Sequence, residues 1–128
     1  NMPENNQFEY AVVRIVPQVE REEFLNVGVV LFCAKQNFLQ VRYLLNEFRL
    51  LAFCPQVDVE EIGAYLAAFE QICVGAEDAG PIARLTMAER FRWLTSTRST
   101  MVQTSKVHPG LCTDAGEMLK KIYIQQAL

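Results

Sequence analysis

The polar side chains that could do chemistry gather in one stretch, between Arg98 and Gly110. An arginine, two serines, an amide and a histidine recur there at short spacing: Arg98, Ser99, Gln103, Ser105 and His108. Arginine and hydroxyl groups bind phosphate or carboxylate, and an imidazole can transfer a proton near neutral pH. The alternative is that the hydroxyls and the amide satisfy backbone groups along an edge strand.

Arg14 joins this set because it lies between Val13 and Ile15, and a charged side chain among apolar neighbours needs a partner. The candidate ligand-binding residues are therefore Arg14, Arg98, Ser99, Gln103, Ser105 and His108. They predict a site for a phosphorylated or carboxylated molecule if they converge on one cleft.

Nucleophilic catalysis would need a nucleophile and a base in contact, and His108 is the only histidine. Ser99, Ser105 and Cys112 are near it in sequence, and Asp114 could orient the ring. No spacing matches a nucleophile elbow, a P-loop or a dinucleotide-binding glycine motif. No catalytic residue is assigned, and a structural role for His108 at a turn is an equal interpretation.

Four cysteines and one histidine bound the metal chemistry of the chain. The cysteines, Cys33, Cys54, Cys73 and Cys112, form no CxxC pair, so the common zinc patterns are not available. We predict free thiols, no metal site and no cofactor.

Charge is distributed unevenly along the chain. Residues 47–78 hold seven acids and one base, whereas residues 84–106 hold five bases and one acid. The bases include Arg84, Arg90 and Arg92, which with Arg98 could form an anion-binding face; two solvated surfaces that attract each other are the simpler interpretation. A net charge of -3 argues against nucleic acid as the main partner, because phosphate contacts favour basic domains.

The elements that would position these residues follow from the hydrophobic pattern. Apolar and β-branched runs predict strands at Phe8–Val16, Phe24–Ala34 and Phe38–Leu44, the last two joined as a hairpin. Gly28 inside the second run indicates a bulge or the close approach of another backbone. A fourth strand is predicted at Thr100–Val107, pairing with the first, and His108-Pro109-Gly110 is predicted to turn.

Helical periodicity fills the rest of the chain. A short helix is predicted at Asn46–Phe53. The pairs Asp58 with Glu61, Thr86 with Glu89, and Asp114 with Glu117 have capping-box spacing and each begin a helix, and Gly75 is placed to end the first of these three.

The order β-β-β-α-α-α-β-α predicts an α+β fold, with an antiparallel or mixed four-stranded sheet and about four helices packed on it. We expect a single domain over residues 8–126, preceded by a polar tail over residues 1–7. The longest apolar runs have eight residues, and no signal pattern is visible, so we expect no membrane span and a cytoplasmic location.

Two segments carry a resemblance to a known family. The first reads Tyr-Ala-Val-Val-Arg-Ile-Val-Pro at residues 10–17 and continues through Asn-Val-Gly-Val-Val-Leu-Phe at residues 26–32. The second begins at Glu89 and runs through Arg98-Ser99-Thr100, Gln103, Ser105, His108 and Gly110 to Asp114. Together they resemble the signatures of a family of short bacterial proteins catalogued as a domain of unknown function.

The resemblance implies a protein partner but no activity and no catalytic residues. The family has no established activity and no assigned catalytic residues. Its members are often encoded beside a kinase resembling the HipA toxin type, which implies a kinase-like protein partner. The family often has a small polar residue where this chain has Cys112, which weakens a nucleophilic role for that thiol.

Two functions of different classes remain open. The first is a non-catalytic protein-binding or adaptor module, which predicts an exposed apolar or charged patch. The second is a small anion-binding domain or enzyme built around His108, which predicts that Arg14, Arg98 and His108 meet around a cleft. The oligomeric state is left open.

Overall fold

A computed structural model describes residues 5–17, 23–96 and 100–128 of the chain. Its centre is one antiparallel sheet with the order β3-β2-β1-β4, in which β5 also pairs with β1. The strands are β1 (Asn6–Ile15), β2 (Leu25–Cys33), β3 (Phe38–Tyr43), β4 (Val102–Thr104) and β5 (His108–Cys112). The predicted α+β class and the antiparallel sheet are confirmed, and the sheet has five strands instead of four.

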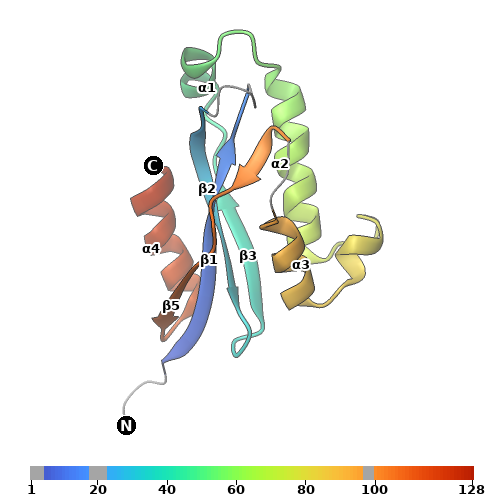
Figure 1. Cartoon of the computed structure of the whole chain (residues 1–128), viewed down its shortest axis with the longest axis vertical. Helices are drawn as coiled ribbons and strands as arrows, with labels where there is room; N and C mark the ends of the chain where they lie inside the picture. The colour runs from blue at the N-terminus through green and yellow to red at the C-terminus, as the bar shows by residue number, and fades with distance from the viewer. Residues whose placement is uncertain (1–4, 18–22, 97–99) are drawn as a thin grey trace.

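Helices cover both faces of the sheet, so the fold has three layers (Figure 1). On one face lies α4 (Ala115–Ala127); on the other lie α2 (Val59–Val74) and α3 (Met87–Leu94). The short helix α1 (Glu47–Phe53) lies at one end of the sheet, and the 3-10 helix η2 (Pro81–Arg84) precedes α3.

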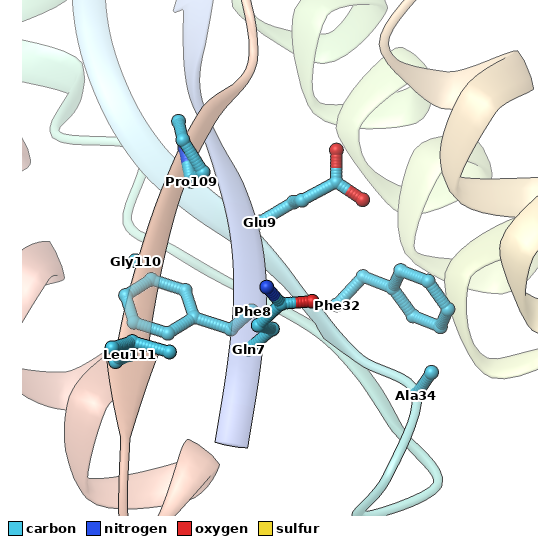
Figure 2. Close-up of a pocket in the computed structure, with 8 residues that line it drawn as sticks. All are labelled: Gln7, Phe8, Glu9, Phe32, Ala34, Pro109, Gly110 and Leu111. Atoms are coloured by element: carbon cyan, nitrogen blue, oxygen red, sulfur yellow. The ribbon is translucent and has the colours of Figure 1, made fainter. Parts of the chain in front are cut away.

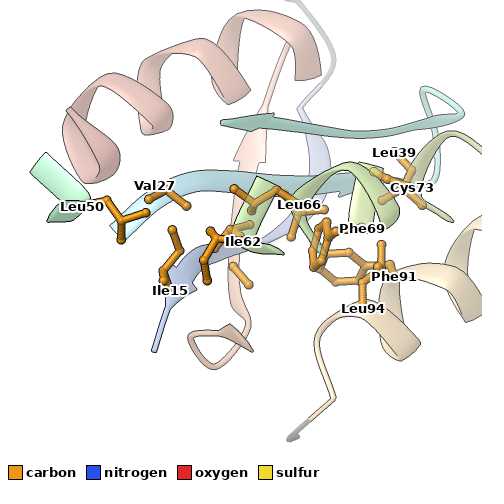
Figure 3. Packing of buried hydrophobic residues seen from close by; sticks show 13 residues of the cluster. Ile15, Val27, Leu39, Leu50, Ile62, Leu66, Phe69, Cys73, Phe91 and Leu94 are labelled. Atoms are coloured by element: carbon orange, nitrogen blue, oxygen red, sulfur yellow. The ribbon is translucent and has the colours of Figure 1, made fainter. Parts of the chain in front are cut away.

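Alternate residues of β1 supply two separate cores. Ala11, Val13 and Ile15 are fully buried and face α2 and α3, where they join Ile62, Leu66 and Phe91. Figure 3 shows this larger cluster between β2 and the helices. Phe8 packs on the opposite face with α4 residues such as Leu119 and Ile122. This explains why the β1 segment is apolar at successive positions: a central strand is buried on both faces.

Gly28 lies where the backbones of β2 and β3 approach each other closely. It pairs with Tyr43 of β3, and a Cβ at this position would lie 2.5 Å from the Arg42 carbonyl oxygen. The β1–β2 register also shifts beside it, because Val13 opposes Gly28 while Arg14 opposes Asn26. Both features predicted from this glycine, a bulge and a close backbone approach, are confirmed.

The polar segment after α3 differs from its prediction. Instead of one strand followed by a turn, β4 and β5 lie end to end along the same edge of β1. His108, Pro109 and Gly110, predicted to turn, are the first residues of β5. Proline is compatible with this place because β5 is an edge strand, where one N–H faces solvent and a missing donor costs little. The predicted pairing with β1 is confirmed.

Helix termini follow the capping pattern of the sequence. The side chain of Asp58 accepts a hydrogen bond from Glu61 N at 3.1 Å, and that of Asp114 accepts one from Glu117 N at 3.0 Å. Thr86 and Glu89 form the complete reciprocal box. Gly75 ends α2 in the left-handed conformation, with φ of 71°. The helix η2 was not predicted, because it begins at Pro81 within the glycine- and proline-rich stretch 75–82, whose composition favours a loop.

Candidate functional site

Arg14 and Gln103, two of the predicted ligand-binding residues, are direct cross-strand partners. On the other side of Arg14, Asn26 of β2 accepts a hydrogen bond from Arg14 Nε at 3.3 Å. The Arg14 guanidinium carbon also lies 3.9 Å from the centroid of the Phe24 ring, a cation–π contact. Burial lowers the pKa of Arg14 from its ordinary value, yet a guanidinium keeps its proton in proteins. Arg14 therefore has the partners that a charged side chain among apolar neighbours requires, namely Asn26 and the Phe24 ring.

Polar side chains of β2 and α1 hold the C-terminal end of α4. Asn26 Nδ2 donates to the carbonyl oxygen of Gln126 at 3.3 Å, and Arg49 Nη1 donates to that of Ala127 at 3.5 Å. The last carbonyls of a helix have no partner within the helix and carry partial negative charge. Donors from β2 and α1 satisfy two of these carbonyls. Asn26, the partner of Arg14, therefore has a structural role.

Ser105 also has a structural role. Its side chain is buried, and its Oγ accepts a hydrogen bond from Val12 N at 2.9 Å and donates one to the Lys106 carbonyl at 2.9 Å. Ser105 N donates to the Val12 carbonyl at 2.9 Å. Ser105 thus ties the link between β4 and β5 to β1, and its hydroxyl is occupied by backbone groups.

His108 is separated from this arginine along the sheet. It pairs with Tyr10, its exposed ring lies against the Tyr10 ring at a centroid distance of 5.2 Å, and both share the sheet face of Arg14. Tyr10 and Arg14 are four residues apart on β1, about 13 Å at the strand rise of about 3.3 Å per residue. The two side chains therefore sit over different parts of the sheet.

Arg98 and Ser99 lie outside the described residues, so four of the six predicted site residues can be placed. Of these, Arg14 and Gln103 are neighbours, and Ser105 and His108 serve other parts of the β1 edge. Gln103 Nε2 donates to the Thr100 carbonyl at 2.8 Å, which is a local backbone contact. The side chains of Arg14, Gln103 and Ser105 therefore all hydrogen-bond to groups within the fold.

The thiol near His108 is poorly suited to act as a nucleophile. Cys112 is buried, and burial raises the pKa of its thiol, with a further rise from the neighbouring Cys33. A cysteine nucleophile reacts as the thiolate, which a raised pKa disfavours. Cys73 is more extreme, because burial raises its pKa to about 12.

A shallow pocket of about 500 Å³ opens on the other face of the β1–β5 edge (Figure 2). Its lining is largely apolar, with one amide and one carboxylate: Gln7, Phe8, Glu9, Phe32, Ala34, Pro109, Gly110 and Leu111. His108 is absent from that lining although Pro109 is present, since adjacent strand residues point to opposite faces. Of the four predicted ligand-binding residues that the structure describes, none lines this pocket.

A second pocket, of about 310 Å³, lies between β3 and the helices α2 and α3. Arg90 and Glu70 contribute to its wall. Arg90 Nη1 donates to the Leu85 carbonyl at 2.6 Å, while its Nε is buried with no partner. Because that Nε is covered by protein atoms, it is not presented to a ligand.

The feature that sequence reasoning missed is the exposed apolar face of α1. Phe48 is 90% exposed and Leu51 39% exposed, and Leu44 just before the helix is 58% exposed. Only Leu50 of this helix is buried. A signal was available, because five of the seven residues in Glu47–Phe53 are apolar and a helix at the surface buries only one stripe.

The part of the chain that the structure describes contains no group of three metal-ligating side chains. Nor does any described helix combine the length and apolar character needed to cross a bilayer.

Comparison with known proteins agrees with the resemblance seen in the two segments. No curated protein and no solved structure matches the chain. A family model described as a protein of unknown function, DUF3037, matches residues 10–126, which is most of the chain. The chain therefore belongs to the DUF3037 family of proteins of unknown function.

Proposed function

We propose that this domain is a non-catalytic protein-binding module, and that the outer face of α1 is the surface that contacts the partner. The observation that carries the proposal is the 90% exposure of Phe48 on a helix whose single buried residue is Leu50. Scattered apolar residues are normal on protein surfaces, but clustered exposed ones mark interaction sites. Phe48 and Leu51 are three residues apart and so share one side of the helix.

The structural roles of the other candidates also support a binding module over an enzyme. Arg14 is bound to Asn26, and the Ser105 hydroxyl is bound to Val12 N and the Lys106 carbonyl. His108 lies against Tyr10, apart from Arg14 and Asn26. An active site would need such groups to converge on one point with free hydrogen-bonding capacity.

The partner proposed from the family resemblance is a kinase-like protein, and the proposed setting is the cytoplasm of a bacterial cell. A kinase-like partner fits a module that supplies contact surface without chemistry of its own. This part of the proposal rests on the family context alone, whereas the α1 surface rests on the exposure of Phe48 and Leu51.

Site-specific photo-crosslinking tests the proposed surface in the native host. A photoreactive phenylalanine analogue placed at Phe48 should give one discrete adduct of higher mass, containing a second protein. Val74 is the matched control, since it is 59% exposed and apolar but lies in the last turn of α2. Identical adducts at both positions, or none at position 48, would contradict the proposal.

A further inference from the structure

The surroundings of the α1 surface restrict what can bind there. Within residues 44–61 the acids are Glu47, Asp58, Glu60 and Glu61, and the single base is Arg49, which gives this segment a net charge of -3. All four carboxylate side chains are exposed. The turn at residues 54–58 joins α1 to the first turn of α2 at the same end of the molecule (Figure 1). The exposed apolar side chains of α1 therefore lie at the end of the molecule that carries this negative charge.

Local roles explain where these acids lie without neutralising them. Asp58 caps α2, Glu61 accepts a hydrogen bond from Tyr65 OH at 3.0 Å, and Glu47 and Glu60 are in first helical turns. Acids in these positions stabilise helix N-termini. The partners of Asp58 and Glu61 are a backbone N–H and a hydroxyl, which are neutral, so these contacts leave the net charge of -3 in place.

The single base of residues 44–61, Arg49, is bonded within the fold. Arg49 follows Phe48 in the helix, and its Nη1 donates to the Ala127 carbonyl at the end of α4. Its charge is thereby directed to the C-terminus of another helix, where a cation is favourable. The outward side of α1 presents Phe48, Leu51 and Ala52, which are all exposed.

Two kinds of occupant are disfavoured by this charge. A second copy would bring an identical segment of charge -3 against the first, because the same patch meets itself in a two-fold dimer. An anionic membrane surface would repel it also, since such surfaces attract basic segments. Both would have to overcome repulsion to cover Phe48.

We infer that the α1 surface binds a basic amphipathic helical segment of another protein. Apolar side chains of that segment, spaced three or four residues apart, would cover Phe48 and Leu51. Its lysine or arginine side chains would lie near Glu47, Glu60 and Glu61. α1 has seven residues and is about 10 Å long at 1.5 Å per helical residue, so it matches about two turns of a partner helix. This inference rests on the proposed function and specifies the chemistry of its partner.

Three designed helical peptides test directly whether the α1 surface prefers a basic partner. They share one leucine face, and their polar faces carry lysine, glutamine or glutamate. Titration into ¹⁵N-labelled protein should shift the amide resonances of residues 44–61 most strongly with the lysine peptide. We expect that peptide to bind at least tenfold more tightly than the glutamate peptide in 0.1 M salt. The difference should shrink in 1 M salt, where the screening length falls from about 10 Å to about 3 Å.

Variants separate the apolar from the electrostatic contribution. Phe48→Ser should remove binding of the lysine peptide, whereas the control Val74→Ser should not. Glu47→Gln with Glu60→Gln should weaken the lysine peptide severalfold and leave the glutamine peptide unchanged. Folding of each variant is checked by its amide spectrum.

The outcomes distinguish this inference from the proposed function. Equal binding of all three peptides at α1 would overturn the basic partner and leave a protein-binding surface standing. Failure of the lysine peptide to shift residues 44–61 would overturn the inference, while a protein adduct at position 48 in the host would still support the proposed function. A dimer in sedimentation, or binding to anionic vesicles, that Phe48→Ser abolishes would overturn it in favour of a second copy or a membrane.

Discussion

Arg14 Nε donates a hydrogen bond to Asn26 Oδ1 across neighbouring strands, at 3.3 Å. Asn26 in turn donates to the Gln126 carbonyl, so one amide joins the arginine of β1 to the last turn of α4. Amino acids in two distant parts of the sequence thus hold a helix end against the sheet. An arginine that resembled a ligand-binding group has a structural partner instead.

Removing the Asn26 amide should loosen this connection. Asn26→Ala leaves Arg14 Nε and the Gln126 carbonyl without their protein partner, and we expect the free energy of unfolding to fall by about 1 kcal/mol. Gln40→Ala is the control, because Gln40 is an exposed amide on β3 and should change stability by less than about 0.5 kcal/mol. Chemical denaturation measures both. Equal effects of the two substitutions would contradict the structural role of Asn26.

Two glycines should respond to alanine with opposite signs. At Gly28 the new Cβ would lie 2.5 Å from the Arg42 carbonyl and 2.6 Å from Tyr43 Cβ, so β2 and β3 must separate. We expect a loss of about 2–3 kcal/mol or failure to fold. At Gly63, inside α2, the nearest atom is Leu45 Cδ2 at 3.9 Å, and alanine should stabilise the helix by about 0.5–1 kcal/mol. Thermal unfolding of the two variants tests this, and a stable Gly28→Ala protein would refute it.

Ser105 and His108 should differ in their effect on stability. Ser105→Ala leaves the buried Val12 N–H without its Oγ acceptor, and we expect a loss of about 1–3 kcal/mol. His108→Ala removes an exposed ring that contacts Tyr10, and the loss should stay below about 1 kcal/mol. Guanidinium unfolding curves at pH 7.5 compare them. A greater loss at His108 than at Ser105 would show that this assignment is reversed.

The buried thiol of Cys73 should make the fold sensitive to alkali. Its pKa is raised to about 12 from an ordinary 9.0, so above pH 9 the unfolded chain releases a proton that the folded protein retains. Stability from this group is complete below pH 9 and is lost as pH rises toward 12, at about 1.4 kcal/mol per pH unit.

Cys73→Ala isolates that effect, because the tyrosines that titrate in the same range remain in both proteins. Alanine lowers stability at pH 7.5 by opening space in the core, but the decline between pH 9 and 10.5 should be shallower by about 2 kcal/mol than in the parent. Unfolding curves at these pH values provide the comparison. Parallel declines would contradict the raised pKa.

Periodicity and capping patterns were sufficient to locate most of the fold. The three N-terminal strands, the four α-helices and the caps at Asp58, Thr86 and Asp114 follow from local chemistry, because each depends on residues close in sequence. Gly28 also signalled a tertiary contact, since a glycine inside a strand is unfavourable without a reason.

The edge of β1 could not be predicted in the same way. Pro109 and Gly110 resemble a turn, yet their pairing with β1 decides their conformation. That pairing depends on Ser105, whose side chain takes a backbone position opposite Val12. The Ser105 side chain takes the place of a backbone acceptor through a contact between residues that are 93 positions apart in the sequence. Such a contact leaves no local periodic signal.

The candidate site shows the same limit. Residue types identified Arg14, Gln103, Ser105 and His108 as polar residues worth examining, but types do not tell whether a side chain binds a ligand or its own backbone. The α1 surface was missed for a related reason. The sequence of this short helix does not show which of its apolar side chains are buried, and in the structure Leu50 is buried while Phe48 and Leu51 are exposed.

The most direct test of a protein-binding function is affinity purification of the tagged protein from its host, with bound proteins and small molecules both identified by mass spectrometry. Three variants accompany the parent: Phe48→Ser, Val74→Ser and His108→Ala. We predict a stoichiometric protein partner that is lost with Phe48→Ser and retained with the other two. A co-purifying anion without a protein partner, lost with His108→Ala and retained with Phe48→Ser, would contradict the account and support a ligand site.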